Sequence, residues 1–210
     1  MLKKIKIPKD YNYIGAFLTL NCNLSCSYCI NLNEEGSDRK SILRKSMSGE
    51  DWAKALNRLQ INRDDLPVTL QGGEPTLHKE FLKIVNGVSE EIKLDLLTNM
   101  IFDVDKFIQN VPAKKFTRDA KYAAIRVSYH PGQNDIDDLI AKHHKLRDAG
   151  IYVGIYSVMV PQNQEHIKEV QKKCLQEGVD FRVKEYLGFD GQEWHGTYKY
   201  PEAITQKVNR

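Results

Sequence analysis

The sequence predicts an α/β fold in which six strand–helix units form an open, partial TIM barrel, (βα)6, around a parallel sheet. Short apolar runs of strand length alternate with longer segments whose apolar residues recur at helical spacing. The connections between them are short, which favours parallel strands joined by right-handed crossovers. Six units are fewer than the eight of a closed barrel, so we expect the sheet to stay open.

The first half of the chain is expected to supply three of the six units. Residues 14–20 are an apolar run that predicts the first strand. Polar residues at 31–47 form a long insertion after it. Ser48 with two acids close behind it is typical of a helix N-cap. The following apolar stripe is Trp52, Ala55, Leu56 and Leu59. Strands at 68–71 and 93–99 then alternate with a helix on Phe81, Ile84, Val85 and Val88 and a short helix at 104–108.

The second half is expected to supply the other three units. Strands are predicted at 123–130, 151–160 and 179–187. One helix carries Ile136, Leu139, Ile140, His143 and Leu146, and Gly150 ends it as a C′ glycine. The next carries Ile167, Val170, Cys174 and Leu175. We therefore expect a barrel domain over 1–187 and, because 188–210 lack clear periodicity, a tail that packs on or beyond the last strand.

Polar and apolar residues alternate within several of these strands, so the two faces of the sheet differ. The face expected to lie under the helices carries Leu70, Leu94, Leu96, Ile125, Val127, Phe181 and Val183. The opposite face carries Thr19, Asn21, Thr69, Gln71, Asp95, Asn99, Arg126, Ser128, His130, Lys184 and Tyr186. Parallel strands covered on both sides normally read as continuous apolar runs. A polar inner face predicts that the open barrel encloses a polar ligand, because unpaired polar groups are costly to bury.

Three cysteines, Cys22, Cys26 and Cys29, lie within eight residues at the end of the first strand. Three thiolates can bind three irons of a [4Fe–4S] cluster and leave the fourth iron open. A structural zinc site closes its shell with four ligands. Four cysteines in 210 residues do not look like a secreted disulfide scaffold. We expect Cys174, on an apolar helical stripe, to be a packing residue.

The cysteine spacing, C-x3-C-x2-C with Tyr28 before the last Cys, resembles the motif of the radical S-adenosylmethionine (SAM) enzymes. A second motif, Gly72-Gly73-Glu74-Pro75, follows the strand at 68–71, where that superfamily has its GGE motif. The resemblance spans roughly residues 14–187 and implies a (βα)6 fold. Because no Cys follows Cys174, the chain is similar to compact members without a C-terminal auxiliary-cluster domain.

This resemblance implies two cofactors, a [4Fe–4S] cluster and SAM. The open iron would bind the methionyl group of SAM, and one electron would cleave SAM to a 5′-deoxyadenosyl radical that takes a hydrogen from a substrate. The implied electron donor is a flavodoxin or a ferredoxin, and the substrate class that the resemblance favours is a peptide or protein. The protein would supply positioning and exclusion of water.

The resemblance also implies roles for individual residues at the carboxyl ends of the strands. Cys22, Cys26 and Cys29 would bind the cluster. Contacts with SAM would come from Tyr28, Gly72, Gly73, Glu74, Asn99, Ser128, Val158, Tyr186 and Leu187. Where the superfamily often has Gly after Thr-Asn, this chain has Met100.

Three charged residues fall on the inner face by two-residue periodicity: Asp95, Arg126 and Lys184. Isolated charges there would be penalised, so we expect them to pair with one another or with a charged ligand. Arg126 is expected to reach either Asp95 or the methionyl carboxylate of SAM. Arg126 and His130 are also the candidates for facing the substrate.

The composition argues against a nucleic-acid-binding or membrane protein. The formal net charge is +3, and 28% of residues are charged, which does not suggest a nucleic-acid or membrane-surface protein. No apolar run approaches the roughly 18 residues of a membrane span, and there is no signal peptide. An oxygen-sensitive cluster implies a cytoplasmic protein. A basic group, Arg39, Lys40, Arg44 and Lys45, is a candidate docking site for an acidic electron donor or substrate, whereas the basic connection at 114–121 is expected to be a solvated loop.

Other functions remain open at this point. Within the enzymes, the alternatives are a glycyl-radical activating enzyme or a small-molecule enzyme of the deazapurine type. A different class is a non-catalytic iron–sulfur or zinc-binding module that serves as a partner platform. Formation of 5′-deoxyadenosine from SAM would separate the enzymes from the binding module.

Overall fold

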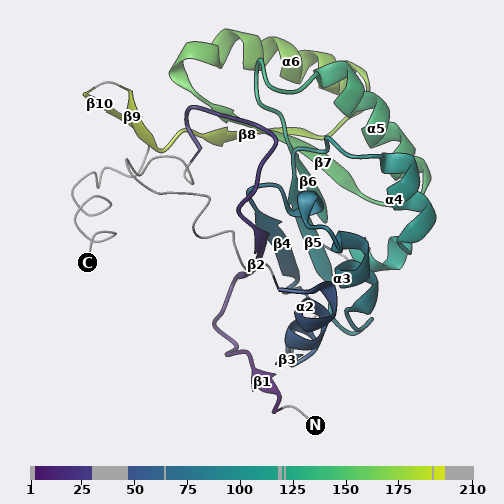
Figure 1. The fold of residues 1–210 in the computed structure, drawn as a ribbon. Coiled ribbons are helices and arrows are strands. Elements are labelled where there is room, and N and C mark those ends of the chain that lie inside the picture. The colour runs from purple at the N-terminus through teal and green to yellow at the C-terminus, as the bar shows by residue number, and fades with distance from the viewer. Residues whose placement is uncertain are drawn as a thin grey trace.

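A curved sheet of six parallel strands forms the body of the protein (Figure 1). The computed structural model describes residues 3–29, 47–63, 65–117, 120, 122–190 and 192–196. The strand order is β2-β4-β5-β6-β7-β8. Their bounds are Ile14–Thr19 (β2), Val68–Gly72 (β4), Leu94–Thr98 (β5), Ile125–Ser128 (β6), Val153–Met159 (β7) and Phe181–Glu185 (β8). The order follows the chain without a reversal, as the predicted open partial barrel requires.

Helices cover the convex side of this sheet and leave the concave side open (Figure 1). They are α2 (Gly49–Leu56), α3 (Phe81–Gly87), α4 (Val104–Asn110), α5 (Ile136–Asp148) and α6 (Gln164–Gln176). Short 3-10 helices lie at Pro75–Leu77 (η1), Ala113–Phe116 (η2) and Pro161–Asn163 (η3). Ser48 caps α2 as predicted, because its side chain accepts a hydrogen bond from the amide of Asp51. The parallel sheet, the helical layer and the open barrel therefore confirm the predicted fold.

The first helix is shorter than its apolar stripe predicted. Asn57 ends α2, because its amide side chain bonds Gly87 O and Ser89 N at the end of α3. Leu59 then leaves the helix and joins a two-residue strand, β3 (Leu59–Gln60), which pairs in parallel with β1 (Ile5–Lys6). Two-residue strands have no periodicity that a sequence pattern could detect.

The hydrophobic core lies between the sheet and the helices. The predicted outer residues Leu70, Leu94, Leu96, Ile125, Val127 and Phe181 are all buried there, with Val183 partly buried. Two expectations were wrong. Leu175 is 64% exposed, because α6 buries Ile167, Val170 and Cys174 and turns the next position outward. Lys115, expected in a solvated loop, is buried and donates to Val88 O.

Arg126 contacts Asp95 and Thr69, and the alternation assigned all three to the concave face. Arg126 Nη2 lies 3.0 Å from Asp95 Oδ2 and 3.4 Å from Thr69 Oγ1. The Arg126 side chain is 16% exposed and that of Asp95 is fully buried. Arg126 was expected to reach either Asp95 or a cofactor carboxylate, and the contact with Asp95 confirms the first alternative. The same contact confirms the predicted inward direction of Arg126.

The last described residues form a small antiparallel hairpin, β9 (Gly188–Asp190) and β10 (Glu193–His195), beyond β8. It projects away from the helical layer (Figure 1). The predicted boundary at 187 stays a prediction. Within the described residues, no helix is both long and apolar enough to cross a membrane.

The buried ion pair generates a prediction about stability. We expect Arg126→Met to lower the free energy of unfolding by about 3–5 kcal/mol, because it leaves the Asp95 carboxylate buried without its partner. The double variant Asp95→Leu/Arg126→Met should lose less than Arg126→Met alone. Urea unfolding measures both.

A matched control uses the exposed pair of Lys168 and Glu165 on α6. Lys168→Met should change stability by about 0–1 kcal/mol. The losses in free energy of unfolding of the two single variants, Asp95→Leu and Arg126→Met, are then compared with that of the double variant. If the two single losses simply added up to the loss of the double variant, the two residues would not be energetically coupled.

Candidate functional site

The three cysteines lie in the loop that follows β2, at the carboxyl edge of the sheet. Cys26 is buried, whereas Cys22 and Cys29 are partly exposed. Burial, together with the nearby Cys29 and Cys22, raises the pKa of the Cys26 thiol to about 11. A thiol whose pKa is raised in this way stays protonated near neutral pH unless a cation lies beside it. A metal ion supplies that charge, because it deprotonates the thiol that binds it. In the described ranges, no three His, Cys, Asp or Glu side chains converge on a single ion.

Backbone and side-chain hydrogen bonds attach the start of this loop to β4 and β5. Gly73 N donates to Thr19 O at 2.9 Å, and Glu74 N donates to Asn21 O at 2.7 Å. Asn99 Nδ2, just past β5, donates to Asn23 Oδ1 at 2.7 Å. The loop therefore leaves β2 along a path that its neighbouring strands determine.

The rest of the loop is attached to the turn after β6. Ser25 N donates to Gln133 Oε1 at 3.1 Å, and the Tyr28 hydroxyl lies 2.8 Å from His130 Nδ1. Burial lowers the pKa of His130 to about 4 and raises the pKa of Tyr28. The imidazole is therefore neutral and the phenol protonated near neutral pH, so the contact between them is a hydrogen bond between two uncharged groups.

The close contact between the start of the cysteine loop and the end of β4 requires the glycine pair of the second motif. Gly72 has φ +148°, and a Cβ there would lie 1.9 Å from Thr19 O. A Cβ on Gly73 would lie 2.3 Å from Asn21 O and 2.5 Å from Leu20 O. Only glycine lets the end of β4 approach the cysteine loop so closely.

Glu74 connects this motif to β5. Its Oε1 accepts hydrogen bonds from Thr76 N, Thr76 Oγ1 and Thr98 Oγ1 at 3.1, 2.6 and 2.8 Å. Its Oε2 accepts one from Asn99 N at 2.7 Å. The side chain is 1% exposed, and burial raises the pKa of its carboxyl although these donors oppose the shift. In this arrangement Glu74 is a positioning residue that holds the ends of β4 and β5 together.

Met100 occupies the position where the superfamily often has glycine. Its φ is +56°, the left-handed conformation, and it is the only described non-glycine residue with positive φ. The side chain is fully buried in the core. The chain thus keeps a glycine-like backbone here with a large side chain, at a strain of about 1–2 kcal/mol.

Asn134 is a site residue that sequence reasoning missed. Its Nδ2 donates to Ser128 O at 2.9 Å and to Asn99 O at 3.3 Å, and its Oδ1 accepts from His130 N at 2.8 Å. It therefore joins the ends of β5 and β6 beneath the cysteine loop. A turn-forming Pro-Gly followed by Asn was the available signal, but the partners could not be inferred from it.

The remaining predicted SAM contacts lie farther along the same edge. Ser128 is half-buried at the end of β6, and Val158 is half-buried on β7. Tyr186 and Leu187 follow β8 rather than belong to it. They lie against the hairpin, where the rings of Tyr186 and His195 are 6.2 Å apart. Arg39, Lys40, Arg44 and Lys45 lie outside the described residues.

Comparison with known proteins identifies the family. The family model described as the radical SAM superfamily matches residues 17–174. The chain belongs to the radical SAM superfamily. Radical SAM proteins use a [4Fe–4S] cluster and SAM as cofactors.

Curated relatives resemble the chain at low identity. The GTP 3′,8-cyclase of Listeria monocytogenes is 23% identical over 225 residues, 99% of this chain and 64% of that protein. The GTP 3′,8-cyclase of Nautilia profundicola is 25% identical over 190 residues, 87% of this chain and 58% of that protein. The chain thus spans less than two thirds of the length of these relatives.

Solved radical SAM structures share the fold. SuiB of Streptococcus suis bound to S-adenosylmethionine aligns with TM-score 0.60 at 20% identity, over 99% of this chain and 46% of that one. The anSMEcpe structure with bound AdoMet and the Kp18Cys peptide aligns with TM-score 0.59 at 16% identity, over 90% of this chain and 54% of that one. At these identities the likeness establishes the fold alone.

The residues present fit the superfamily's cluster. The three thiols of the loop are close enough to influence one another's ionisation, and yet they do not surround a single ion. A cubane cluster ties each thiolate to a different iron, so it needs thiols that are near one another but spread apart. Cys174 is fully buried on α6 and serves in packing, as predicted.

The neutral His130 generates a prediction about pH. Its folded-state pKa is about 4, below the ordinary 6.5, so the unfolded chain binds a proton first as pH falls. The contribution of His130 to the free energy of unfolding should therefore be complete above about pH 6.5 and should decline as the pH falls toward 4. Between pH 7 and 5, the metal-free protein should lose up to about 2 kcal/mol through His130.

Urea unfolding of the wild type and of His130→Gln at both pH values isolates this contribution. The variant should lose less stability on acidification than the wild type. Equal losses in the two proteins would show that His130 titrates normally in the folded state.

Proposed function

We propose that this chain is a radical SAM enzyme that cleaves SAM reductively at a [4Fe–4S] cluster and abstracts a hydrogen atom from a substrate. Cys22, Cys26 and Cys29 would hold the cluster. The observation that carries the proposal is the attachment of their loop to the ends of β4, β5 and β6 by hydrogen bonds. In a parallel αβ barrel these strand ends are where ligands bind.

The bound cluster would supply an electron to the sulfonium of SAM and so generate the 5′-deoxyadenosyl radical. The chain's own residues would position the reactants and exclude water. We assign the SAM contacts to Tyr28, Gly72, Gly73, Asn99, Ser128, Val158, Tyr186 and Leu187. Glu74 would act through Asn99 and the turn at Thr76, because its carboxylate is already occupied by their donors.

The substrate and the electron donor belong to the same proposal. A peptide or protein is the first candidate substrate. The curated relatives, which are named for a reaction of GTP, support a small molecule as the second. A reducing partner such as a flavodoxin or ferredoxin would deliver the electron in the cytoplasm. A glycyl-radical enzyme as substrate, and a non-catalytic metal-binding module, remain the competing functions.

Cluster content gives the first test. Protein reconstituted without oxygen should bind close to four irons and four sulfides per chain and form 5′-deoxyadenosine from SAM when reduced. Each of Cys22→Ala, Cys26→Ala and Cys29→Ala should lose the cluster. Cys174→Ala, the matched control, should retain it. A requirement for Cys174, or zinc in place of iron, would contradict the proposed function.

Cofactor affinity gives a second test. Glu74→Ala should weaken SAM binding by about 1.5–3 kcal/mol, because the donors that shape the SAM pocket lose a charged acceptor. The iron content should stay unchanged. Calorimetric titration with SAM measures the effect, and Glu165→Ala on the outer surface of α6 is the control. Unaltered affinity in Glu74→Ala would refute the positioning role.

A further inference from the structure

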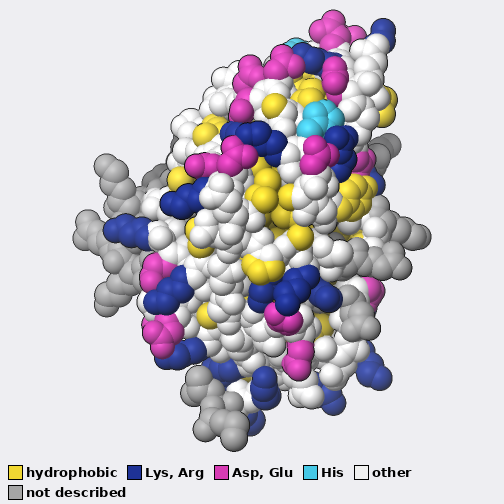
Figure 2. Space-filling model, turned by 90° about the vertical axis from the view of Figure 1, so that its right-hand side faces the viewer, with side chains coloured by type: hydrophobic (Ala, Val, Ile, Leu, Met, Phe, Trp, Pro, Cys, Tyr) yellow, Lys and Arg dark blue, Asp and Glu magenta, His cyan; other side chains and the backbone are white. Residues whose placement is uncertain are grey.

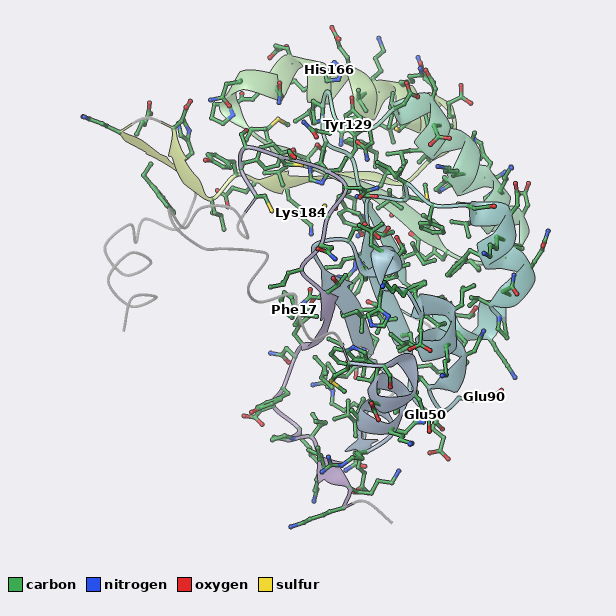
Figure 3. The ribbon with its side chains drawn as sticks, viewed as in Figure 1. Phe17, Glu50, Glu90, Tyr129, His166 and Lys184 are labelled. Carbon is green, nitrogen blue, oxygen red and sulfur yellow. The ribbon has the colours of Figure 1, made fainter. Side chains whose placement is uncertain are left out.

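A second group of polar side chains lies on the concave face of the sheet, on β6, β7 and β8. Lys184 projects from β8 into the concave space (Figure 3). Its Nζ lies 5.3 Å from the centroid of the Tyr156 ring on β7. Across the part of the chain that the structure describes, Lys184 makes no ion pair and no hydrogen bond. Among these residues, the face of the Tyr156 ring is the group that stabilises its charge.

Arg126 and Tyr156 beside it have unused hydrogen-bonding groups. The guanidinium of Arg126 uses Nη2 for Asp95 and Thr69, whereas its buried Nε has no hydrogen-bond partner among the described residues. The Tyr156 hydroxyl is also buried with no partner in that part of the chain, and the residue is 9% exposed. Buried polar groups in native proteins are nearly always satisfied, so two such groups together indicate a ligand that completes them.

The strand register brings these residues together. Arg126 pairs with Gly154, Tyr156 pairs with Arg182, and Val158 pairs with Lys184. One strand, β7, separates Arg126 from Lys184, and Lys184 lies four residues farther along the sheet, so their backbones are about 16 Å apart. Tyr156 lies midway between the two levels, and Lys184 reaches back over its ring. Burial, and next the charge of Arg126, lower the pKa of Lys184. The residue is nevertheless exposed, so a solute can reach its ammonium group.

The charges in this group do not balance. Asp95 neutralises Arg126, and Asp180 neutralises Arg182. Among the described residues of this group, Lys184 is the cation that remains without a carboxylate. On the helical face, by contrast, acidic and basic side chains are interspersed around an apolar strip (Figure 2). Asp95 lies on β5, on the side of Arg126 that faces away from β8, so it does not reach Lys184. An anion that contacts Arg126 and Lys184 together would balance the second charge.

We propose that Lys184 and Arg126 form an anion-binding site on the concave face, floored by the Tyr156 ring, which holds a phosphate or carboxylate group of the substrate. The assignment to a substrate rests on the proposed function. The site adjoins the proposed SAM contacts, because Lys184 pairs with Val158 and lies two residues before Tyr186. The anion is therefore tested with SAM already bound.

Binding of simple anions to the reconstituted full-length chain tests this site. Pyrophosphate and malonate are titrated calorimetrically in saturating SAM at constant ionic strength, and the tighter of the two identifies the chemical source of the anion. Lys184→Met should weaken binding of the preferred anion at least tenfold. Lys172→Met, which removes an exposed lysine from the outer side of α6, should leave binding unchanged. Lys184→Arg should restore most of the affinity.

The outcomes separate this inference from the proposed function. Equal anion affinity in Lys184→Met and Lys172→Met, or no binding by the wild type, would overturn the site. Anion binding that SAM abolishes would also overturn it, because the site would then belong to the SAM carboxylate. Failure of the wild type to form 5′-deoxyadenosine overturns the proposed function instead, and a tenfold loss in Lys184→Met still supports the anion site.

Discussion

The hydrogen bonds between the cysteine loop and the ends of β4, β5 and β6 are the constraint on which the site depends. Residues 20–29 contain no helix or strand, so the loop cannot hold its own conformation. Its order comes from partners just past the ends of three neighbouring strands: Glu74 N, Asn99, Gln133 and His130. Because parallel strands end at one edge of the sheet, the fold delivers all of these partners to the same place.

Burial of polar groups is the consequence of this arrangement. Glu74 accepts four hydrogen bonds in a nearly closed environment, and Asn134 ties two strand ends with one amide. His130 stays neutral because it is buried beside a protonated phenol. Such networks are stable only when every member is satisfied. The residues that fix the cysteine loop are therefore also residues on which the stability of the barrel edge depends.

Much of the fold and site could be predicted from the sequence, because periodicity and short motifs carry that information locally. Two-residue alternation placed Arg126 and Asp95 on one face, and the cysteine spacing located the cluster loop. The other features depend on tertiary contacts. Lys115 is buried because it reaches a carbonyl 27 residues away, and Asn57 ends its helix through contacts with α3. Asn134 reads as an ordinary turn residue until its partners are known.

The central claim is that three thiols hold a [4Fe–4S] cluster whose fourth iron is open to SAM. Mössbauer spectroscopy of protein reconstituted with 57Fe, with and without SAM, tests it most directly. The account predicts the spectrum of a [4Fe–4S] cluster in which one iron differs from the other three, and the signal of that iron alone should shift when SAM is added. Four equivalent irons that do not respond to SAM, or a mononuclear site, would contradict it.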